Sequence, residues 1–450
     1  MCGAGVLQGP VRSSARPDTR AISSRPRATV SYPRPTPRNP VGETRSVEDP
    51  YDIVIVGAGP AGATAAYAAE RRGLHVALID RACFPRDKPC GDGIGPGAVT
   101  VTRQLGLSDI FARDIPVAAV TVAGPDGAEL NVTTSEMGSA VYGYIVPRRD
   151  FDKRLLDHAL KENAADFTGC KFIRTGTTDH FRTVEIQKED GSRSHLTGRL
   201  LIGADGANSV VRRALGVPAS SPAHTGLAMR AYAGSDAFGP GGPQGPRMYF
   251  SFSRELLPSY AWLFPTGRGT VNIGVGGPVT EVRKARQDMR RLLATYADQF
   301  RAHGIDLTEL QSHRAHHLPH FGGMPPLAHP RAALIGDAAS MINPFSGEGI
   351  AYGMTAAARL IESLPDDLTR SRILQAALTG FERDFRRTYR AHIASTLVLH
   401  RLMRSPSWAK LFISAAQRDP VVLQDAIELL FGFGRAHILT AARILGTRMH

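Results

Sequence analysis

One glycine-rich turn constrains the fold of this chain more than any other feature. The motif Gly-Ala-Gly-Pro-Ala-Gly at 57–62 follows a β-branched run at 53–56 and precedes an Ala-rich stretch at 61–72. A second apolar run at 74–79 then reaches Asp80. This pattern predicts a strand, a turn, a helix and another strand, which together form one βαβ unit of a parallel sheet.

Each glycine of the turn has its own physical task. Gly57 permits the tight turn, Gly59 lets the backbone approach a pyrophosphate, and Gly62 allows the helix to pack closely on the strand. The helix N-terminus adds free N–H groups and a partial positive charge for the phosphates. Asp80 is spaced to meet the adenosine ribose hydroxyls. The unit predicts a bound dinucleotide, and the alternative is a tight turn without a ligand.

Two later segments also place an aspartate at the end of a buried strand. Asp205-Gly206 follows the run at 200–202, and Gly336-Asp337 follows the run at 332–335. Such aspartates point into the crevice where cofactors sit in open α/β sheets. Each aspartate alone could instead cap a helix. Three strand-end acids in one chain favour a cofactor crevice.

These three motifs resemble the dinucleotide, Asp-Gly and Gly-Asp signatures of a flavoprotein family. The family includes aromatic hydroxylases, flavin halogenases and geranylgeranyl reductases. The resemblance implies FAD as the cofactor, with Asp337 on the ribityl chain and Asp205-Gly206 supporting the crevice. It also implies that Arg148, in an Arg-x-x-Phe-Asp pattern, contacts FAD, although adjacent Arg149 is an alternative. The segment after Gly336-Asp337 leads into a helix whose N-terminus is expected to face the flavin ring, through Pro344, Gly347, Gly349 and Ile350.

Two further segments indicate which members of that family this chain resembles most. Lys-Pro-Cys-Gly-Asp-Gly at 88–93 resembles the Lys-x-Cys-Gly-x-Gly segment of geranylgeranyl and related polyprenyl reductases. Tyr-Ala-Trp-Leu-Phe-Pro at 260–265, followed by Gly-Val-Gly at 274–276, resembles the Tyr-x-Trp-x-Phe-Pro…Gly-x-Gly signature of the same family. Flavin halogenases carry Trp-x-Trp-x-Ile-Pro instead. The resemblance extends from Tyr51 to the C-terminus.

The resemblance implies an FAD-dependent reductase that saturates carbon–carbon double bonds of a prenyl chain or terpenoid, with NAD(P)H as electron donor. Cys90 and Asp92 are the candidates for the required proton donor, although Cys90 can also be an inert buried thiol. Tyr260, Trp262 and Phe264 are expected to line the substrate site, or else to be core residues. The alternative functions are a monooxygenase of a hydrophobic natural product, a halogenase and a non-catalytic flavin-binding protein.

Composition narrows the remaining classes. The net charge is +13, but the Arg-rich residues 1–49 supply part of it, and no Lys/Arg run interleaved with aromatic residues predicts nucleic-acid binding. Neither the four cysteines nor the histidines between 313 and 320 show the spacing of a metal site. No apolar run approaches the ~20 residues of a membrane-spanning helix. We therefore expect a cytoplasmic enzyme, with peripheral membrane contact as an open alternative and with oligomeric state undetermined.

The expected fold is α/β, with a Rossmann-type FAD-binding domain, a second antiparallel-sheet substrate domain and C-terminal helices. Residues 1–49, rich in Arg, Pro and Ser, form a predicted disordered leader. The predicted ranges are 51–105, 145–215 and 328–385 for the FAD-binding domain, 106–144 and 216–327 for the substrate domain, and 386–450 for the helical segment.

Overall fold

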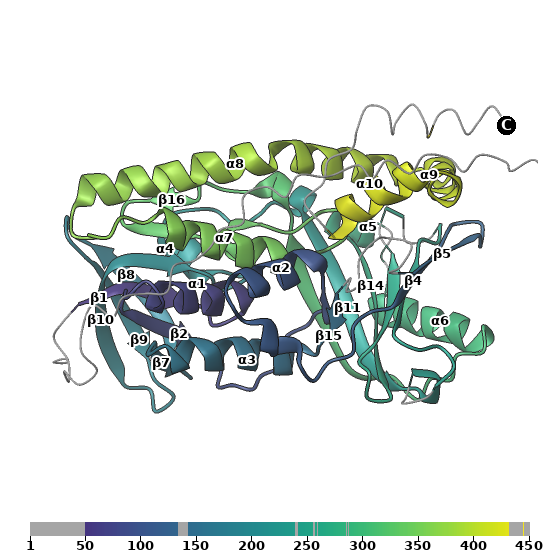
Figure 1. Ribbon diagram of the computed structural model, residues 1–450, viewed down its shortest axis with the longest axis horizontal. Coiled ribbons are helices and arrows are strands. Elements are labelled where there is room, and N and C mark those ends of the chain that lie inside the picture. The colour runs from purple at the N-terminus through teal and green to yellow at the C-terminus, as the bar shows by residue number, and fades with distance from the viewer. Residues whose placement is uncertain are drawn as a thin grey trace, which may run out of the picture.

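The computed structural model describes residues 50–133, 143–238, 242–254, 257–258, 260–284, 286, 288–431 and 444. The predicted leader at 1–49 lies outside these residues, as does most of the C-terminal segment after 431. Two large sheets stand side by side along the molecule, and helices cover them (Figure 1). This arrangement confirms the expected α/β fold class.

The first sheet is mainly parallel. Within the described ranges it has eight strands in the order β16-β17-β10-β1-β2-β7, and β8 and β9 extend it beside β10. Its strands are β1 (Tyr51–Val56), β2 (Val76–Asp80), β7 (Ala165–Thr168), β8 (Lys171–Thr177), β9 (Arg182–Gln187), β10 (Arg193–Gly203), β16 (Ala328–His329) and β17 (Ala332–Leu334).

Register brings the three sequence motifs to one edge of this sheet. Val56 of β1 pairs with Ile79 of β2 and with Gly203 of β10, and Gly203 pairs in turn with Leu334 of β17. All four strands run parallel, so their carboxyl ends meet at the same edge. The turns that follow β1, β10 and β17 are therefore neighbours in space, although they are far apart in the sequence.

Helices cover the first sheet and position its turns. The Ala-rich α1 packs against both α3 and α7, and most of its residues are fully buried. Small side chains permit this close packing on three sides. The α-helices among the described residues are α1 (Pro60–Glu70), α2 (Pro96–Gln104), α3 (Arg148–Lys161), α4 (Val210–Ala214), α5 (Val279–Lys284), α6 (Met289–Ala302), α7 (Ile350–Ser363), α8 (Ser371–Leu402), α9 (Pro406–Arg418) and α10 (Pro420–Phe431).

The start of α3 illustrates how a distant residue can replace a local cap. Helix α3 begins at Arg148 after Pro147, and Asp150 lies inside its first turn and not at its N-cap. The Arg148 N–H donates instead to the carboxylate of Asp92, at 3.1 Å. The acceptor thus comes from a residue 56 positions earlier in the chain.

The second sheet carries the other wall of the site. Within the described residues it has seven strands in the order β15-β11-β14-β13-β12-β4-β5, all antiparallel except the β4–β12 pair. Helices α5 and α6 pack against it. The strands are β4 (Ala119–Ala123), β5 (Glu129–Thr133), β11 (Thr225–Gly234), β12 (Arg247–Ser251), β13 (Ala261–Pro265), β14 (Thr270–Pro278) and β15 (Gln311–Pro319). We propose that this sheet is the substrate domain.

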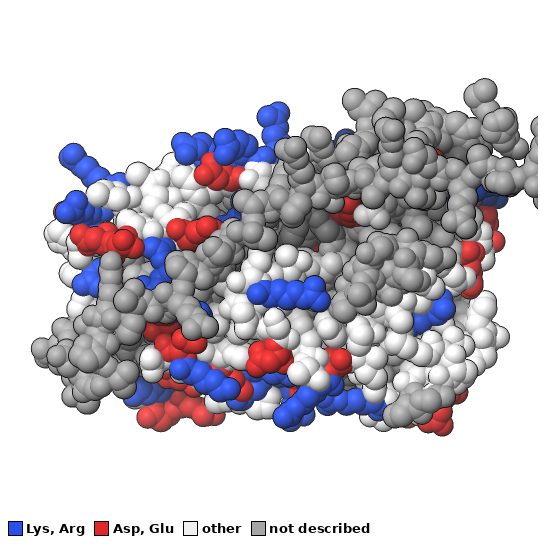
Figure 2. Space-filling view, in the orientation of Figure 1, with Lys and Arg blue, Asp and Glu red and all other residues white. Residues whose placement is uncertain are grey.

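The C-terminal helices join the two halves. The long α8 runs along the upper side of the molecule in Figure 1 and leads to α9 and α10, and α9 packs against β5. None of the described helices has both the length and the apolar character needed to cross a bilayer. On the described part of the face in Figure 2, basic and acidic side chains are intermixed.

Candidate functional site

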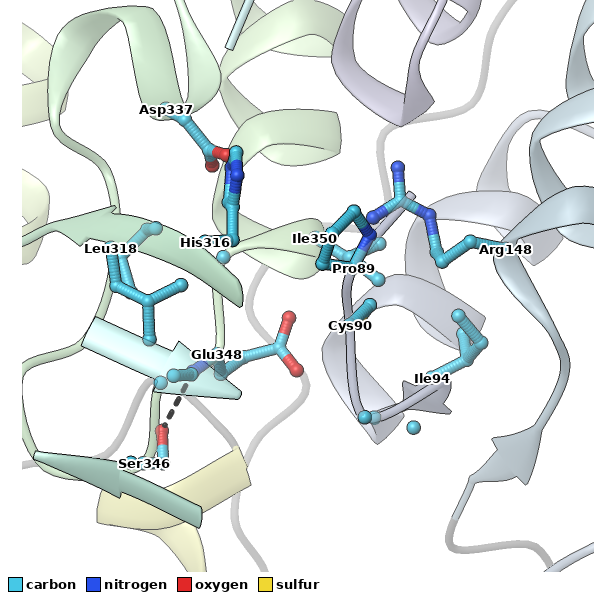
Figure 3. Close-up of a pocket in the computed structure, with 18 of the residues that line it drawn as sticks. Pro89, Cys90, Ile94, Arg148, His316, Leu318, Asp337, Ser346, Glu348 and Ile350 are labelled. Atoms are coloured by element: carbon cyan, nitrogen blue, oxygen red, sulfur yellow. Dashed lines mark hydrogen bonds between the residues drawn. The ribbon is translucent and has the colours of Figure 1, made fainter. Parts of the chain in front are cut away.

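A cavity lies between the carboxyl edge of the first sheet and the second sheet. It is lined by the glycine turn after β1, the segment at 88–96, the start of α3, β11 to β15, and the turn at 342–350 (Figure 3). Most of the predicted site residues meet there: Gly59, Cys90, Arg148, Gly206, Tyr260, Trp262, Phe264, Gly336, Asp337, Pro344, Gly347, Gly349 and Ile350. Gly57, Gly62, Asp80, Asp92 and Asp205 do not line the cavity wall.

The glycine turn leaves no room for larger residues where backbones cross. A Cβ at Gly57 would lie 2.3 Å from the Ala204 carbonyl oxygen, and φ there is +105°. A Cβ at Gly62 would lie 1.7 Å from the Gly57 oxygen. At Gly59 the space is open, and the nearest atoms are guanidinium nitrogens of Arg86 and Arg148 at 3.6 and 3.9 Å. The open cradle thus faces two cations.

The end of β2 holds the glycine turn in shape. The Asp80 carboxylate accepts hydrogen bonds from the N–H groups of Ala58 and Ala82, both at 2.9 Å. Helix α1 begins immediately after Gly59, whose lack of a side chain leaves the first N–H groups without a side-chain cap. These free donors at a helix N-terminus suit a phosphate group.

The turn after β17 contributes an anion that faces a cation. Asp337 forms an ion pair with the Lys88 ammonium at 3.2 Å. Burial disfavours the charged carboxylate, but Lys88 and the neighbouring positive charges outweigh burial and hold the pKa of Asp337 below its ordinary value. His316 lies beside Asp337 in Figure 3, and burial lowers the pKa of His316 to about 4. Asp337 is therefore charged and His316 neutral at neutral pH.

Arg148 is fixed by a buried carboxylate. Its guanidinium donates two hydrogen bonds to Asp152 one helical turn later, at 2.6 and 2.8 Å. Arg86 reaches the same carboxylate at 2.9 Å. A bidentate pair of this kind holds a guanidinium in one orientation. The cavity edge of Arg148 is consequently preorganised beside Gly59.

Asp205 serves the neighbouring helix rather than the cavity surface. Its carboxylate accepts hydrogen bonds from the N–H groups of Val210 and Val211, at 2.6 and 3.1 Å, and also from the Ser209 hydroxyl. These contacts cap α4 and fix the turn that presents Gly206 to the cavity. Of the two alternatives for the Asp205-Gly206 motif, helix capping therefore describes the contacts of the Asp205 side chain. Asp205 supports the crevice only indirectly, through the turn that it fixes.

The two predicted proton donors, Cys90 and Asp92, lie in different surroundings. Cys90 lines the cavity, where burial raises the pKa of its thiol and the facing Arg148 only partly offsets the effect. Asp92 is fully buried behind it and adopts a left-handed backbone with φ +64°. Its carboxylate accepts hydrogen bonds from Tyr232 at 2.5 Å and Asn272 at 2.8 Å. This placement disfavours direct proton donation by Asp92.

The electrostatics of Asp92 follow from this burial. Burial raises the pKa of Asp92 to about 6, although the hydrogen bonds from Tyr232 and Asn272 favour the charged form. Asn272 also donates to the Cys90 carbonyl at 2.7 Å and accepts from the Trp262 indole at 2.9 Å. Asn272 therefore ties the Cys90 segment to the aromatic wall. Asn272 lies in the eight residues between the two parts of the aromatic signature, so no sequence motif identified it as a site residue.

The aromatic signature forms one wall of the cavity. Tyr260, Trp262 and Phe264 alternate along β13 and its start, so their side chains lie on the same face, and all three line the cavity. Trp262 pairs across the sheet with Gly274, where a Cβ would lie 2.0 Å from the indole ring. The Gly-x-Gly part of the signature thus makes space for the tryptophan.

The turn at 343–349 supplies a cavity carboxyl that sequence reasoning missed. Glu348 projects into the cavity on the side of Cys90 and Ile94 (Figure 3). Its Oε1 accepts a hydrogen bond from the Ala351 N–H at 2.8 Å, at the start of α7. Burial raises the pKa of Glu348, and the α7 N–H groups and Arg148 only partly oppose this. The cofactor signature assigns roles to Gly347 and Gly349 but none to Glu348 between them.

The described residues fit a dinucleotide. The open cradle at Gly59, the uncapped N–H groups of α1 and the two guanidinium groups form a site for phosphates. The start of α7, with Gly349 at its N-cap, is a second helix end at the same cavity, where the Glu348 carboxylate accepts from the Ala351 N–H. Within the described residues, no group of three or more metal-ligating side chains forms a metal site.

Comparison with known proteins agrees with this geometry. Residues 50–376 match the family described as FAD binding domain. The chain is 37% identical over 321 residues to menaquinone reductase of Mycobacterium tuberculosis, covering 71% of this chain and 78% of that protein. It is 32% identical to geranylgeranyl diphosphate reductase of Rhodobacter capsulatus, covering 67% and 72% of the two chains.

Among solved structures, a geranylgeranyl bacteriochlorophyll reductase-like protein from Thermoplasma acidophilum has the same fold. Its TM-score is 0.72 at 19% identity, and the match covers 84% of this chain and 96% of that one. The family match, the similar reductases and the shared fold lead to the same conclusion. The protein belongs to the FAD binding domain family and is an FAD-dependent oxidoreductase of the geranylgeranyl reductase family.

Proposed function

We propose that this enzyme saturates carbon–carbon double bonds in the isoprenoid chain of a quinone or prenyl lipid. The observation that carries the proposal is the polarity of its cavity. Lys88, Asp337 and Arg148 give it a charged part, and aromatic and aliphatic side chains line much of the rest. A flavin and a long apolar chain require such a division.

A second cavity extends the apolar part. It lies between the second sheet and helices α8 to α10, and all of its lining residues are apolar. Phe250, Phe345 and Phe431 line both cavities, so the two adjoin at these rings. An isoprenoid chain is branched, flexible and apolar, and its distal units would exclude water from this space. A small polar substrate would leave it unfilled.

The relatives support the same class of substrate. The proteins that are 37% and 32% identical to this chain are named for menaquinone and geranylgeranyl diphosphate. Both molecules carry isoprenoid chains, although their polar ends differ. We therefore place the shared isoprenoid portion, rather than either polar end, in the aromatic part of the cavity.

We propose the following roles for the cofactor-binding residues. Gly57, Gly59 and Gly62 shape the turn that receives the FAD pyrophosphate, and Asp80 meets the adenosine ribose. Asp337 holds the ribityl chain, Arg148 contacts FAD beside Gly59, and Gly206 and Gly336 allow close approach. The turn carrying Pro344, Gly347, Gly349 and Ile350 presents the α7 N-terminus to the flavin ring. When bound, reduced FAD supplies a hydride, and we propose NAD(P)H as the donor that reduces it.

The chain must then orient the alkene and deliver a proton. Tyr260, Trp262 and Phe264 provide a flat apolar wall that restricts the alkene and excludes water. An isolated alkene is not electrophilic, so its second carbon needs a proton from a positioned acid. Cys90 stays a predicted candidate, since its thiol lines the cavity in protonated form.

An anaerobic half-reaction tests this function. The FAD-loaded enzyme is photoreduced and mixed with geranylgeranyl diphosphate or a menaquinone, and flavin absorbance and product mass are followed. We expect flavin reoxidation and a product that gains two hydrogens in its isoprenoid chain. Under air, a product that gains one oxygen would instead identify a monooxygenase. Failure of every isoprenoid to reoxidise the flavin contradicts the proposal.

Peripheral membrane contact belongs to the same proposal, because its substrates reside in lipid. Val398 and Leu402 are exposed on α8 at 55% and 37%, close to Arg401 and Arg404 in the chain. Apolar side chains beside cations suit an anionic lipid surface. Sedimentation with anionic vesicles tests this contact, and binding that is equal with neutral vesicles would argue against a role for the arginines.

A further inference from the structure

We propose that Glu348 donates the proton to the substrate alkene. This inference rests on the proposed function, because it assigns the acid that alkene reduction requires. The geometry that points to Glu348 is a carboxyl group that projects into the cavity among the polar side chains of Arg148 and Asp337 and the apolar side chains of Ile94 and Leu318 (Figure 3).

The backbone of Glu348 is held rigidly. Its carbonyl accepts a hydrogen bond from the Asn343 N–H at 2.9 Å. The Asn343 side chain, itself fully buried, accepts from the Phe345 N–H at 2.9 Å and donates to the Leu429 carbonyl at 2.9 Å. The turn is therefore fixed from inside and from α10. A donor held in this way can keep a constant distance to a bound alkene.

The two carboxyl oxygens of Glu348 have different surroundings. Oε1 is occupied by the Ala351 N–H, which fixes the side-chain direction. Oε2 points across the cavity and lies 3.6 Å from the position that a Cβ at Gly95 would take. Gly95 and Ile94 also line the cavity. Because Gly95 has no side chain, the space in front of Oε2 remains open to a ligand.

The charges around Glu348 favour its protonated form. Burial is the main cause, and the α7 N–H groups and Arg148 oppose it while Asp337 adds to it. No ion pair to Glu348 forms within the described residues. The titratable groups that face it or share its cavity are Arg148 of α3, Asp337 after β17, Lys88 and Cys90 of the loop, Arg230 of β11, Arg314 and His316 of β15, His320 after β15, Tyr144, Tyr260 before β13 and Tyr352 of α7.

The neighbouring groups keep constant charge around neutral pH. Burial raises the pKa values of Tyr260 and Tyr352, so both stay neutral. His316 is also neutral, and Asp337 remains paired with Lys88. Between acidic and neutral pH, the groups at the cavity that change protonation state are therefore Glu348 and the buried Asp92.

The other two acids are less suitable. Asp92 is outside the cavity, and its carboxylate is occupied by donors from Tyr232, Asn272 and the Arg148 backbone. The Cys90 thiol is a weak acid whose pKa burial raises further. A proton donor works best when its pKa lies near the operating pH. A carboxyl with a raised pKa meets that condition better than a thiol with a raised pKa.

The step balances with one reductant and one acid. Reduced flavin, a two-electron donor, provides a hydride to one alkene carbon. The Glu348 O–H bond breaks as its proton bonds to the other carbon, so the π bond is replaced by two C–H bonds. The resulting Glu348 carboxylate regains its proton from solvent that enters when the product leaves. The net change is a gain of two hydrogens by the substrate.

The test compares E348Q with the wild type as FAD-loaded enzymes. Glutamine keeps an oxygen acceptor for the Ala351 N–H but has no acidic proton, so FAD binding and photoreduction should be unchanged. Reoxidation of the flavin by geranylgeranyl diphosphate, which has no quinone ring to accept the electrons, and formation of the product with two added hydrogens should slow by about 100-fold or more. The wild-type rate should fall as pH rises through the pKa of Glu348, and E348Q should lack this fall.

Matched variants make the outcomes distinct. E382Q changes another carboxyl that accepts a backbone hydrogen bond, from Ala328 at 3.0 Å, and it lies on α8 away from the cavity. It should keep the wild-type rate and pH profile. C90A should slow the reaction but keep the fall with pH, because Glu348 remains.

Three results would overturn the inference. If E348Q reoxidises at the wild-type rate with the same pH profile, Glu348 is not the donor. If C90A rather than E348Q removes the fall with pH, the thiol is the donor. If the wild-type flavin is never reoxidised by an isoprenoid, the proposed function fails and this inference fails with it.

Discussion

At the scale of single residues, the contact between Trp262 and Gly274 connects a sequence signature to the shape of the site. The indole lies where a side chain at Gly274 would have to be. Replacing Gly274 with alanine should displace Trp262 and destabilise the protein by about 1 to 3 kcal/mol, because overpacking forces side chains from their preferred rotamers. Chemical denaturation measures the change.

Gly276 provides the control for this prediction. A Cβ there would meet Ala228 at an ordinary 3.7 Å. G276A should therefore have nearly the wild-type free energy of unfolding. Equal destabilisation of both variants would mean that the glycines matter for strand flexibility and not for the space that Trp262 occupies.

Asp92 predicts a dependence of stability on pH. Its pKa is raised from the ordinary value of 3.8 to about 6 in the folded protein, with burial as the main cause. The folded state therefore binds the proton more tightly than the unfolded state. This contribution is fully present below the unfolded pKa, and it is lost as pH rises through the folded pKa.

The D92N variant tests this contribution. The wild type should lose roughly 2 to 3 kcal/mol of stability from this group between pH 4 and 7, and D92N should lack that loss. Asparagine tolerates the left-handed backbone at this position. Urea denaturation at several pH values gives the two slopes, and parallel slopes would contradict the assignment.

At the scale of elements, the turn at 343–349 depends on one buried amide. Asn343 connects this turn to α10 through the Leu429 carbonyl at 2.9 Å. In N343A, the buried partners would be left unpaired at a cost of about 1 to 3 kcal/mol. Part of that cost should appear as weaker FAD affinity, because we propose that the turn presents the α7 N-terminus to the cofactor. We expect FAD to bind about tenfold more weakly.

Fluorescence titration with FAD measures this effect, and N131A is its control. Asn131 makes side-chain hydrogen bonds to Thr121 and Arg247 within the second sheet, away from the cavity. N131A should bind FAD as the wild type does. Unchanged FAD affinity in N343A would show that the turn keeps its shape without this amide.

At the scale of the whole molecule, Asp87 links the loop after β2 to the second sheet through ion pairs with Arg230 of β11 and Arg314 of β15. Asp87, in the loop after β2, accepts two hydrogen bonds of 2.6 Å from Arg230 of β11. Arg230 is only 1% exposed. Removing one partner of a buried pair leaves an uncompensated charge, so D87A should lose roughly 3 kcal/mol of stability.

A double variant distinguishes this charge effect from lost packing. R230M combined with D87A removes both charges and should recover a large part of the loss, because no buried cation remains unpaired. Thermal unfolding of the single and double variants gives the coupling. If the double variant is less stable than D87A, the packing of Arg230 over Tyr232, at 4.4 Å, contributes more than the charge pair.

Much of the cofactor crevice follows from local sequence, for an identifiable reason. A glycine between a strand and a helix, or an aspartate after a strand, is required by backbone geometry that involves neighbouring residues only. The parallel order of β1, β10 and β17 then brings these local motifs to one edge. The aromatic wall is equally local, because Tyr260, Trp262 and Phe264 alternate along one strand.

The functions of Asp92, Asp205 and Glu348 could not be predicted in this way. Each is an acid in or beside a motif, and its motif gives no information about which distant groups reach its carboxyl. The Asp92 carboxylate accepts hydrogen bonds from residues of β11 and β14, and the Asp205 carboxylate accepts from N–H groups at the start of α4. The Glu348 carboxyl faces an open cavity, because the residue opposite it is Gly95, which comes from a distant part of the chain.

The amino-acid sequence by itself determined the class of fold and the positions of the glycine and aspartate turns, because tight turns and helix ends depend on neighbouring residues. Only the tertiary structure decided which acidic groups are capped, buried behind the wall or open to substrate. The pKa of a carboxyl, and thus its ability to give up a proton, depends on burial and on charges that come from distant parts of the chain.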